Sequence, residues 1–189
     1  MAGEDRTVRA RLAATGELFD GYHPQMRAVH RRNGDGLAQI TAELVGWPGF
    51  AAVGRDGSGA AFTIAQHDIA APALMRQNLE LLRRAVAEGD AESTGLAYLE
   101  DRIRAFEGRV QCYGTQLGWD DAGTFRVWPA VEDASTVDER RAQLGLPPLQ
   151  EHLSRAVEGM PIRERTRSAE DLERHRREAE AFARSVGWQ

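Results

Sequence analysis

The sequence contains no lysine, and all 24 of its basic residues are arginine. This absence excludes Schiff-base chemistry, the lysine that binds pyridoxal phosphate, and the lysine-containing phosphate loop. A single cysteine, Cys112, excludes an internal disulfide. The sequence also lacks a signal peptide and an apolar run long enough to span a bilayer, so we expect a cytoplasmic protein.

An excess of positive charge is also missing, because the formal net charge is -5. Phosphate-rich partners are attracted by positive potential, so we expect neither nucleic acid nor an anionic membrane surface as a partner. A chain of 189 residues fits one domain with a sizeable core. We therefore predict a single domain over residues 1–189.

Apolar residues recur at helical intervals along most of the chain, and prolines and glycines separate these segments. The predicted helices span about residues 4–19, 24–46, 59–69, 72–89, 96–106, 136–144, 149–157 and 169–186. Gly34 and Gly36 could divide the second of these into two helices. Alternating helices with short links indicate a mainly α fold, a compact helical bundle. Within it we distinguish an N-terminal helix (1–20), a core (20–148) and a C-terminal helical extension (149–189).

Extended structure is predicted at a few places only. Residues 119–123 have the composition of a hairpin turn, with 124–128 as the returning strand. Residues 111–116 alternate in a way that suits a strand. One small β-hairpin should therefore pack on the helices. A short extended piece at 50–53 and a turn at 54–57 precede Ser58, which is a plausible N-cap.

The stretch 98–116 combines many hydrogen-bonding side chains with apolar ones. Asp101 and Arg102 lie off the apolar stripe of the predicted helix, where they could face a cleft. Gln111 and Tyr113 share one face of the predicted strand, and Gln116 points the other way. This set suits a small polar ligand but does not identify a reaction.

Several short motifs make the sequence similar to a known family. They are W-P-G at 47–49, G-x-x-G-x-x-A-A before Gln66 and His67, Y-L-x-D-R at 98–102, G-x-x-Q-x-Y-G-T-Q at 108–116, and V-D-x-R-R at 137–141. As a set they resemble a family of uncharacterised bacterial proteins known only as a domain of unknown function. The opening Gly21-Tyr22-His23-Pro24, with Val29-His30, resembles its actinobacterial members. The resemblance runs from about residue 20 to the C terminus and implies one domain whose motif residues belong together. It implies no activity.

His67 is the first candidate for catalysis, because it is a histidine within a helix of small and apolar residues. A buried histidine with an ordinary hydrogen-bond partner is the alternative. Asp101 could orient His67 or act as the base, or else form a surface pair with Arg102. Tyr113 could steady an oxyanion or pass a proton.

Substrate binding is assigned to four residues. The guanidinium of Arg102 can donate two parallel hydrogen bonds to a carboxylate or phosphate. Gln111 offers neutral donors and acceptors, and Gln66 and Gln116 complete the set.

A metal site would need His23, His30 and His67 with a carboxylate. His23 and His30 are two helical turns apart, and neither H-E-x-x-H nor C-x-x-C spacing occurs. We therefore assign no metal ligands and expect no cofactor. His30, next to Arg31 and Arg32, is expected on an exposed face.

The leading hypothesis is a soluble enzyme acting on a small polar, anionic metabolite by cofactor-free acid–base chemistry, such as hydrolysis, elimination or isomerisation. It requires His67, Asp101 and Tyr113 to meet in one hollow. One alternative is a non-catalytic module that binds a small molecule or a protein, and the charged C-terminal helix with its narrow apolar stripe is compatible with a homodimer. The other alternative is a metalloenzyme with histidine and carboxylate ligands.

Overall fold

The structure is a computed structural model that describes residues 2–19, 21–120, 122–160 and 168–189. These residues are mainly helical and include a small two-stranded antiparallel sheet, which confirms the predicted fold class. The chain divides into two compact units, residues 1–99 and residues 100–189. The single domain over 1–189 stays a prediction.

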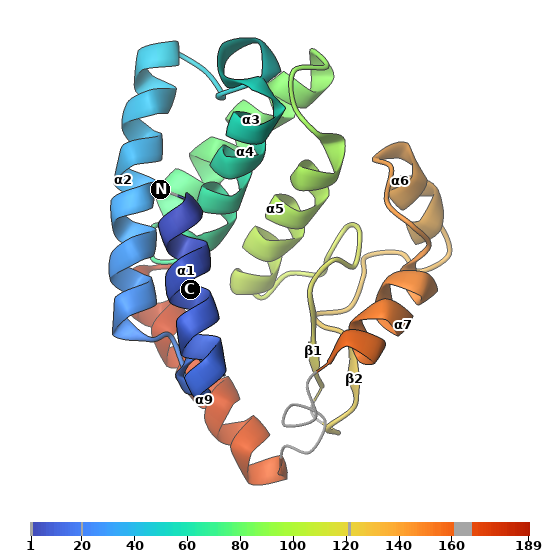
Figure 1. The fold of residues 1–189 in the computed structure, drawn as a ribbon. Helices are drawn as coiled ribbons and strands as arrows, with labels where there is room; N and C mark the ends of the chain where they lie inside the picture. The colour runs from blue at the N-terminus through green and yellow to red at the C-terminus, as the bar shows by residue number, and fades with distance from the viewer. Residues whose placement is uncertain (1, 20, 121, 161–167) are drawn as a thin grey trace. The chain divides into compact units, whose positions relative to one another are not determined.

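The N-terminal unit (residues 1–99) is built from helices. Its elements are α1 (Ala2–Thr15), η1 (Glu17–Phe19), α2 (Pro24–Leu44), α3 (Phe50–His67), α4 (Pro72–Ala87) and the first half of α5 (Ser93–Phe106). Helix α1 packs on α2 and α3, and α3 also contacts α2 and α4 (Figure 1). The buried side chains of this unit include Leu12, Met26, Leu37, Ile64, Met75 and Leu82.

Helix α2 is continuous, although its sequence contains two glycines. Pro24 occupies its first turn, and the His23 side chain accepts a hydrogen bond from the backbone N–H of Gln25 at 3.2 Å. The inner face of α2 buries Met26, Val29 and Leu37. Burial of this stripe outweighs the low helix propensity of glycine.

Helix α3 begins earlier than its sequence predicts, because residues 50–57 are helical except for a kink at Gly54 (φ 71°). Its first turn is capped from a distant segment, since Asp90 Oδ1 accepts the backbone N–H of Ala51 at 2.8 Å. Ser58 is therefore not an N-cap. It lies inside the helix, and its hydroxyl oxygen accepts the indole N–H of Trp47 at 3.2 Å.

Helix α2 ends at a strained residue, which yields a stability prediction. Val45 is the C-cap with φ 52° and ψ 30°, and it is 89% exposed. A left-handed conformation costs an L-residue about 1–2 kcal/mol, and more for a β-branched one, whereas glycine adopts it readily. Val45→Gly should therefore raise the free energy of unfolding by about 1 kcal/mol, measured by urea denaturation. Ala42→Gly, inside the same helix, should lower it by about 1 kcal/mol; equal effects of the two changes would contradict the prediction.

The C-terminal unit (residues 100–189) combines the hairpin with short helices. Its elements are the second half of α5, β1 (Leu117–Trp119), β2 (Phe125–Val127), α6 (Val137–Gln143), α7 (Leu149–Gly159) and α9 (Ala169–Val186). Leu117 pairs with Val127 and Trp119 with Phe125, so the predicted small hairpin is confirmed. Asp121, in the predicted turn, lies outside the described residues. The predicted strand at 111–116 is wrong: apart from one isolated bridge between Gln111 and Val131, this segment is irregular.

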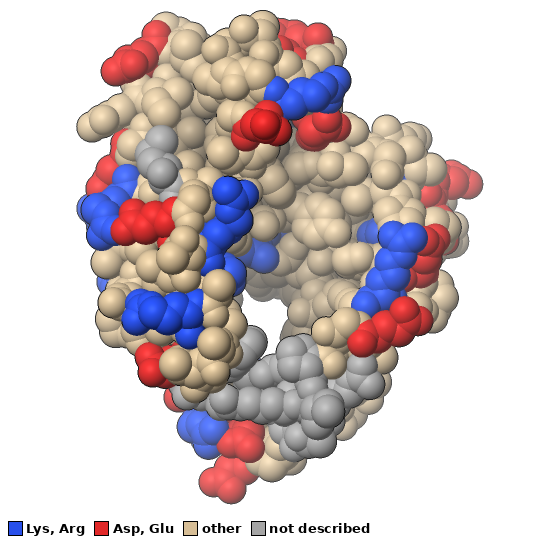
Figure 2. Space-filling view, viewed as in Figure 1, with Lys and Arg blue, Asp and Glu red and all other residues tan. Residues whose placement is uncertain are grey.

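The surface mixes charges of both signs. On the face drawn in Figure 2, arginine side chains lie next to acidic ones. Across the described residues, no helix combines the length and the apolar character needed to cross a lipid bilayer.

Candidate functional site

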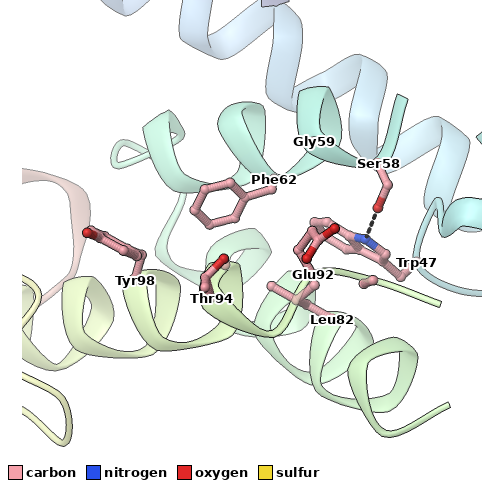
Figure 3. A pocket seen from close by; sticks show the side chains of 10 residues that line it. Trp47, Ser58, Gly59, Phe62, Leu82, Glu92, Thr94 and Tyr98 are labelled. Atoms are coloured by element: carbon pink, nitrogen blue, oxygen red, sulfur yellow. Dashed lines mark hydrogen bonds between the residues drawn. The ribbon is translucent and has the colours of Figure 1, made fainter. Parts of the chain in front are cut away.

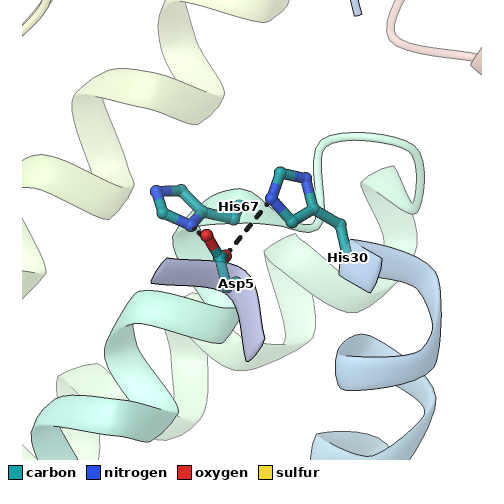
Figure 4. Close-up of side chains that lie close together, drawn as sticks. All are labelled: Asp5, His30 and His67. Carbon is teal, nitrogen blue, oxygen red and sulfur yellow. Dashed lines mark hydrogen bonds and ion pairs between the residues drawn. The ribbon is translucent and has the colours of Figure 1, made fainter. Parts of the chain in front are cut away.

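Three side chains from three helices converge inside the N-terminal unit. Asp5 comes from the first turn of α1, His30 from the second turn of α2 and His67 from the last position of α3. Asp5 Oδ2 lies 2.8 Å from His67 Nδ1 and 3.2 Å from His30 Nε2. Figure 4 shows both imidazoles approaching one carboxylate. We call Asp5, His30 and His67 the Asp–His cluster.

The cluster is largely shielded from solvent, but one member reaches the surface. The side chains of Asp5 and His30 are 2% and 6% exposed, whereas that of His67 is 16% exposed. The predicted exposed position of His30 is wrong. His30 lies with Met26 and Val29 on the buried face of α2. Its position in this helical periodicity determines its burial, although the next two residues are arginines.

The phenol of Tyr22 contacts Nδ1 of His30. Tyr22 Oη lies 2.7 Å from His30 Nδ1, and the two rings stack with centroids 5.6 Å apart. His30 Nε2, on the other side of the ring, is buried and has no hydrogen-bond partner among the described residues. Its 3.2 Å contact with Asp5 is thus close but lacks the direction of a hydrogen bond.

The electrostatics of the cluster favour an ionised carboxylate beside a neutral imidazole. Burial would raise the pKa of Asp5, but the interactions with His30 and His67 outweigh it and hold that pKa below its usual range. Burial lowers the pKa of His67 despite the opposing pull of Asp5. The pKa of Tyr22 is raised by burial and then by the charge of Asp68, so the phenol keeps its proton.

A second carboxylate lies buried against the helix that carries His30. Asp68, the residue after α3, is 1% exposed, and burial raises its pKa to about 7. It packs against Gly34, where an added Cβ would lie 2.2 Å from Asp68 Oδ2. Gly34 is one helical turn after His30 and lies on the same face of α2. Because glycine has no side chain, the Asp68 carboxylate can pack against this face.

In the C-terminal unit, Asp101 organises the motif loop, residues 111–116. Its Oδ1 accepts the backbone N–H of Cys112 at 2.7 Å, and its Oδ2 accepts the N–H and the hydroxyl of Thr115 at 2.9 and 3.1 Å. The N–H of Tyr113 contacts both oxygens, at 3.1 and 3.2 Å. Burial raises the pKa of Asp101, and these hydrogen bonds oppose that rise. Asp101 is 0% exposed, and the loop it binds replaces the predicted strand.

Other predicted binding residues also brace the motif loop. Gln111 is 0% exposed: its amide donates to the carbonyls of Gln116 and Pro129, and its oxygen accepts the Gln116 N–H. Arg102 Nε donates to Gln116 Oε1 at 3.2 Å.

The two arginines of the V-D-x-R-R motif hold the opposite side of this loop. Arg140 Nε donates to the Cys112 carbonyl at 2.9 Å, and the buried Arg141 donates to the Tyr113 carbonyl at 2.6 Å. Asp101 therefore binds the N–H groups of the loop while the arginines bind its carbonyl groups. Residues from two of the sequence motifs thus bind the same loop.

The predicted site residues fall into two sets. His67 and Gln66 belong to the N-terminal unit, whereas Asp101, Arg102, Gln111, Tyr113 and Gln116 belong to the C-terminal unit. The meeting of His67 with Asp101 and Tyr113 stays a prediction. Sequence reasoning missed Asp5 and Tyr22 as partners of the histidines. Tyr22 could have been found from the sequence, because it stands in a motif beside His23-Pro24. Asp5 could not, because it is one of two acidic residues in the first turn of α1 and no sequence pattern distinguishes it.

A cavity of about 230 Å³ also lies in the N-terminal unit, between α3, α4 and α5 (Figure 3). Trp47, Phe62, Leu82 and Tyr98 give it a mainly apolar wall, and Glu92 and Thr94 also line it. Its lining offers no cluster of proton-transfer groups.

Comparison with protein families places the chain. A family model described as "Family of unknown function (DUF6624)" matches residues 1–161. The chain belongs to this family. The DUF6624 match begins before residue 20, where the sequence resemblance started, so it includes Asp5 as well as the motif loop. It ends before α9. No curated protein and no solved structure matches the chain.

Proposed function

We propose that this DUF6624 protein is an enzyme that acts on a small polar, anionic metabolite by acid–base chemistry, with the Asp–His cluster as its reactive centre. The observation that carries the proposal is the 2.8 Å contact between Asp5 and His67. A carboxylate that binds one nitrogen of an imidazole fixes the tautomer and the direction of the ring. In this proposal Asp5 takes the orienting role that the sequence suggested for Asp101.

Access and charge at the cluster support an enzyme. The partial exposure of His67 leaves this imidazole within reach of a ligand, while Asp5 and His30 stay buried beneath it. Arg9 Nε lies 3.4 Å from Asp5 Oδ1, and the Arg9 side chain is 40% exposed. An exposed guanidinium beside the centre suits an anionic group of the metabolite.

The test measures turnover of a panel of phosphate esters, carboxylic acids and amides by the full chain and by His67→Ala. We expect His67→Ala to lower kcat/KM for any substrate found by at least about 100-fold, because a general acid–base group contributes about that much or more. His23→Ala is the matched control, since His23 caps α2 and lies outside the cluster. Full turnover by His67→Ala would refute the proposal, and binding of panel members without turnover would favour the non-catalytic module.

A further inference from the structure

The Asp–His cluster has the composition and spacing of a metal site. We propose that Asp5, His30 and His67 together bind one divalent transition-metal ion of the zinc type. One ligand atom from each residue lies within 4.8 Å of the others. Imidazole nitrogens with a carboxylate oxygen are a ligand set that suits Zn²⁺ and its neighbours in the first transition row.

The two contacts of Asp5 are close to the ligand spacing of a metal-bound set. Ligand atoms about 2.0–2.2 Å from a tetrahedral ion lie about 3.3–3.6 Å from one another. Asp5 Oδ2 and His30 Nε2 are already 3.2 Å apart, and Asp5 Oδ2 and His67 Nδ1 are 2.8 Å apart. The ligand nitrogens of the two imidazoles lie within 4.8 Å of each other. To reach the geometry of a metal site, the second Asp5 contact must open by roughly half an ångström and the two nitrogens must lie about 3.3–3.6 Å apart, which are side-chain adjustments.

The second imidazole supplies independent evidence for a cation. A simple acid–base pair needs only Asp5 and His67, yet α2 carries His30, whose buried Nε2 has no hydrogen-bond partner within the described part of the chain. Leaving a buried polar atom unsatisfied costs about 1–3 kcal/mol, and such atoms are rare in folded proteins. A metal ion between the carboxylate and the two imidazoles would satisfy this nitrogen.

Tyr22 completes the arrangement as a positioning residue. A histidine that binds a metal through one nitrogen usually donates the N–H of the other to an oxygen partner. Tyr22 Oη, 2.7 Å from His30 Nδ1, is placed to accept that hydrogen bond. The N–H then resides on Nδ1, and the lone pair of Nε2 faces Asp5 and His67.

Three protein ligands leave at least one coordination position for water or substrate, as in catalytic zinc sites. A metal ion held by Asp5, His30 and His67 would supply an activated water as the base. In this respect the inference rests on the proposed function, because it names the source of the base at the same centre. Metal binding itself is measurable without a substrate.

The experiment uses the full chain, stripped of metal with a chelator and titrated with Zn²⁺ by calorimetry and with Co²⁺ by visible absorption. We expect one equivalent to bind with a Kd of roughly 1 µM or less and Co²⁺ to give the absorption of a four- or five-coordinate site. His30→Ala should weaken binding by more than roughly 100-fold, and Tyr22→Phe by about 10–100-fold, the usual effect of an outer partner. His23→Ala should leave the affinity unchanged.

Absence of saturable one-to-one binding, or equal affinity in His30→Ala and the unmodified chain, would overturn the inference. His30→Gln serves if His30→Ala fails to fold, because it keeps most of the buried volume. Turnover that survives chelation but is lost in His67→Ala would refute the metal site and support the proposed enzyme function. Stoichiometric metal binding without any loss of turnover in His67→Ala would support the metal site and refute the proposed function.

Discussion

Asp5→Asn is expected to lower kcat/KM by about 10³–10⁴-fold, the loss typical when a carboxylate that orients a catalytic histidine becomes an amide. The amide keeps the shape of Asp5 and can still accept one hydrogen bond, so the fold should persist. It removes the negative charge that acts on both imidazoles, and its NH₂ group cannot bind a metal. Asp5→Asn should therefore lower turnover whether the base is an imidazole or a metal-bound water.

The measurement compares kcat/KM of Asp5→Asn with that of Arg9→Gln, using any substrate that the panel identifies. Arg9 contacts the outer oxygen of Asp5 and is 40% exposed, so its replacement should act mainly on KM. Circular dichroism of both variants checks the fold. Unchanged turnover in Asp5→Asn would show that the reactive centre lies elsewhere.

Asp101→Ala is expected to lower the free energy of unfolding by about 3–5 kcal/mol, because it leaves several buried donors without an acceptor. These donors are the N–H groups of Cys112, Tyr113 and Thr115 and the Thr115 hydroxyl. The loss should appear in urea denaturation as a lower midpoint.

Asp101→Asn separates a structural role from a catalytic one. An amide oxygen can accept some of the loop N–H groups, but the NH₂ group must then face another donor, so we expect this variant to be destabilised as well. Glu139→Ala, at an exposed position in α6, is the surface control and should change stability by less than about 0.5 kcal/mol. Asp101→Asn with full stability and no turnover would instead support the catalytic role predicted from the sequence.

The contacts of the motif loop show why polar composition alone was ambiguous. Asp101, Gln111 and Gln116 have the side chains of a ligand site, but the hydrogen bonds described here connect them with the chain itself. Gly114 lies in this loop with a left-handed conformation (φ 67°), and a Cβ there would lie 2.8 Å from Leu149. A sequence pattern cannot distinguish a backbone acceptor from a substrate acceptor.

Local signals in the sequence by themselves determined much of this protein. The mainly α class, the last helix at residues 169–186 and the presence of a small hairpin follow from apolar periodicity, caps and turn residues that act within a few positions. The sequence also marked His67 as a candidate, because a histidine among small residues is unusual.

Only the tertiary structure decided which partners His67 has and where α3 begins. Asp5 precedes His67 by 62 residues, and the Asp90 cap follows Ala51 by 39. Such contacts arise when packing of apolar faces brings distant helices together, and no local pattern encodes them. His30 shows the same limit: its neighbours Arg31 and Arg32 suggested exposure, whereas the packed inner face of α2 buries it beside Asp5.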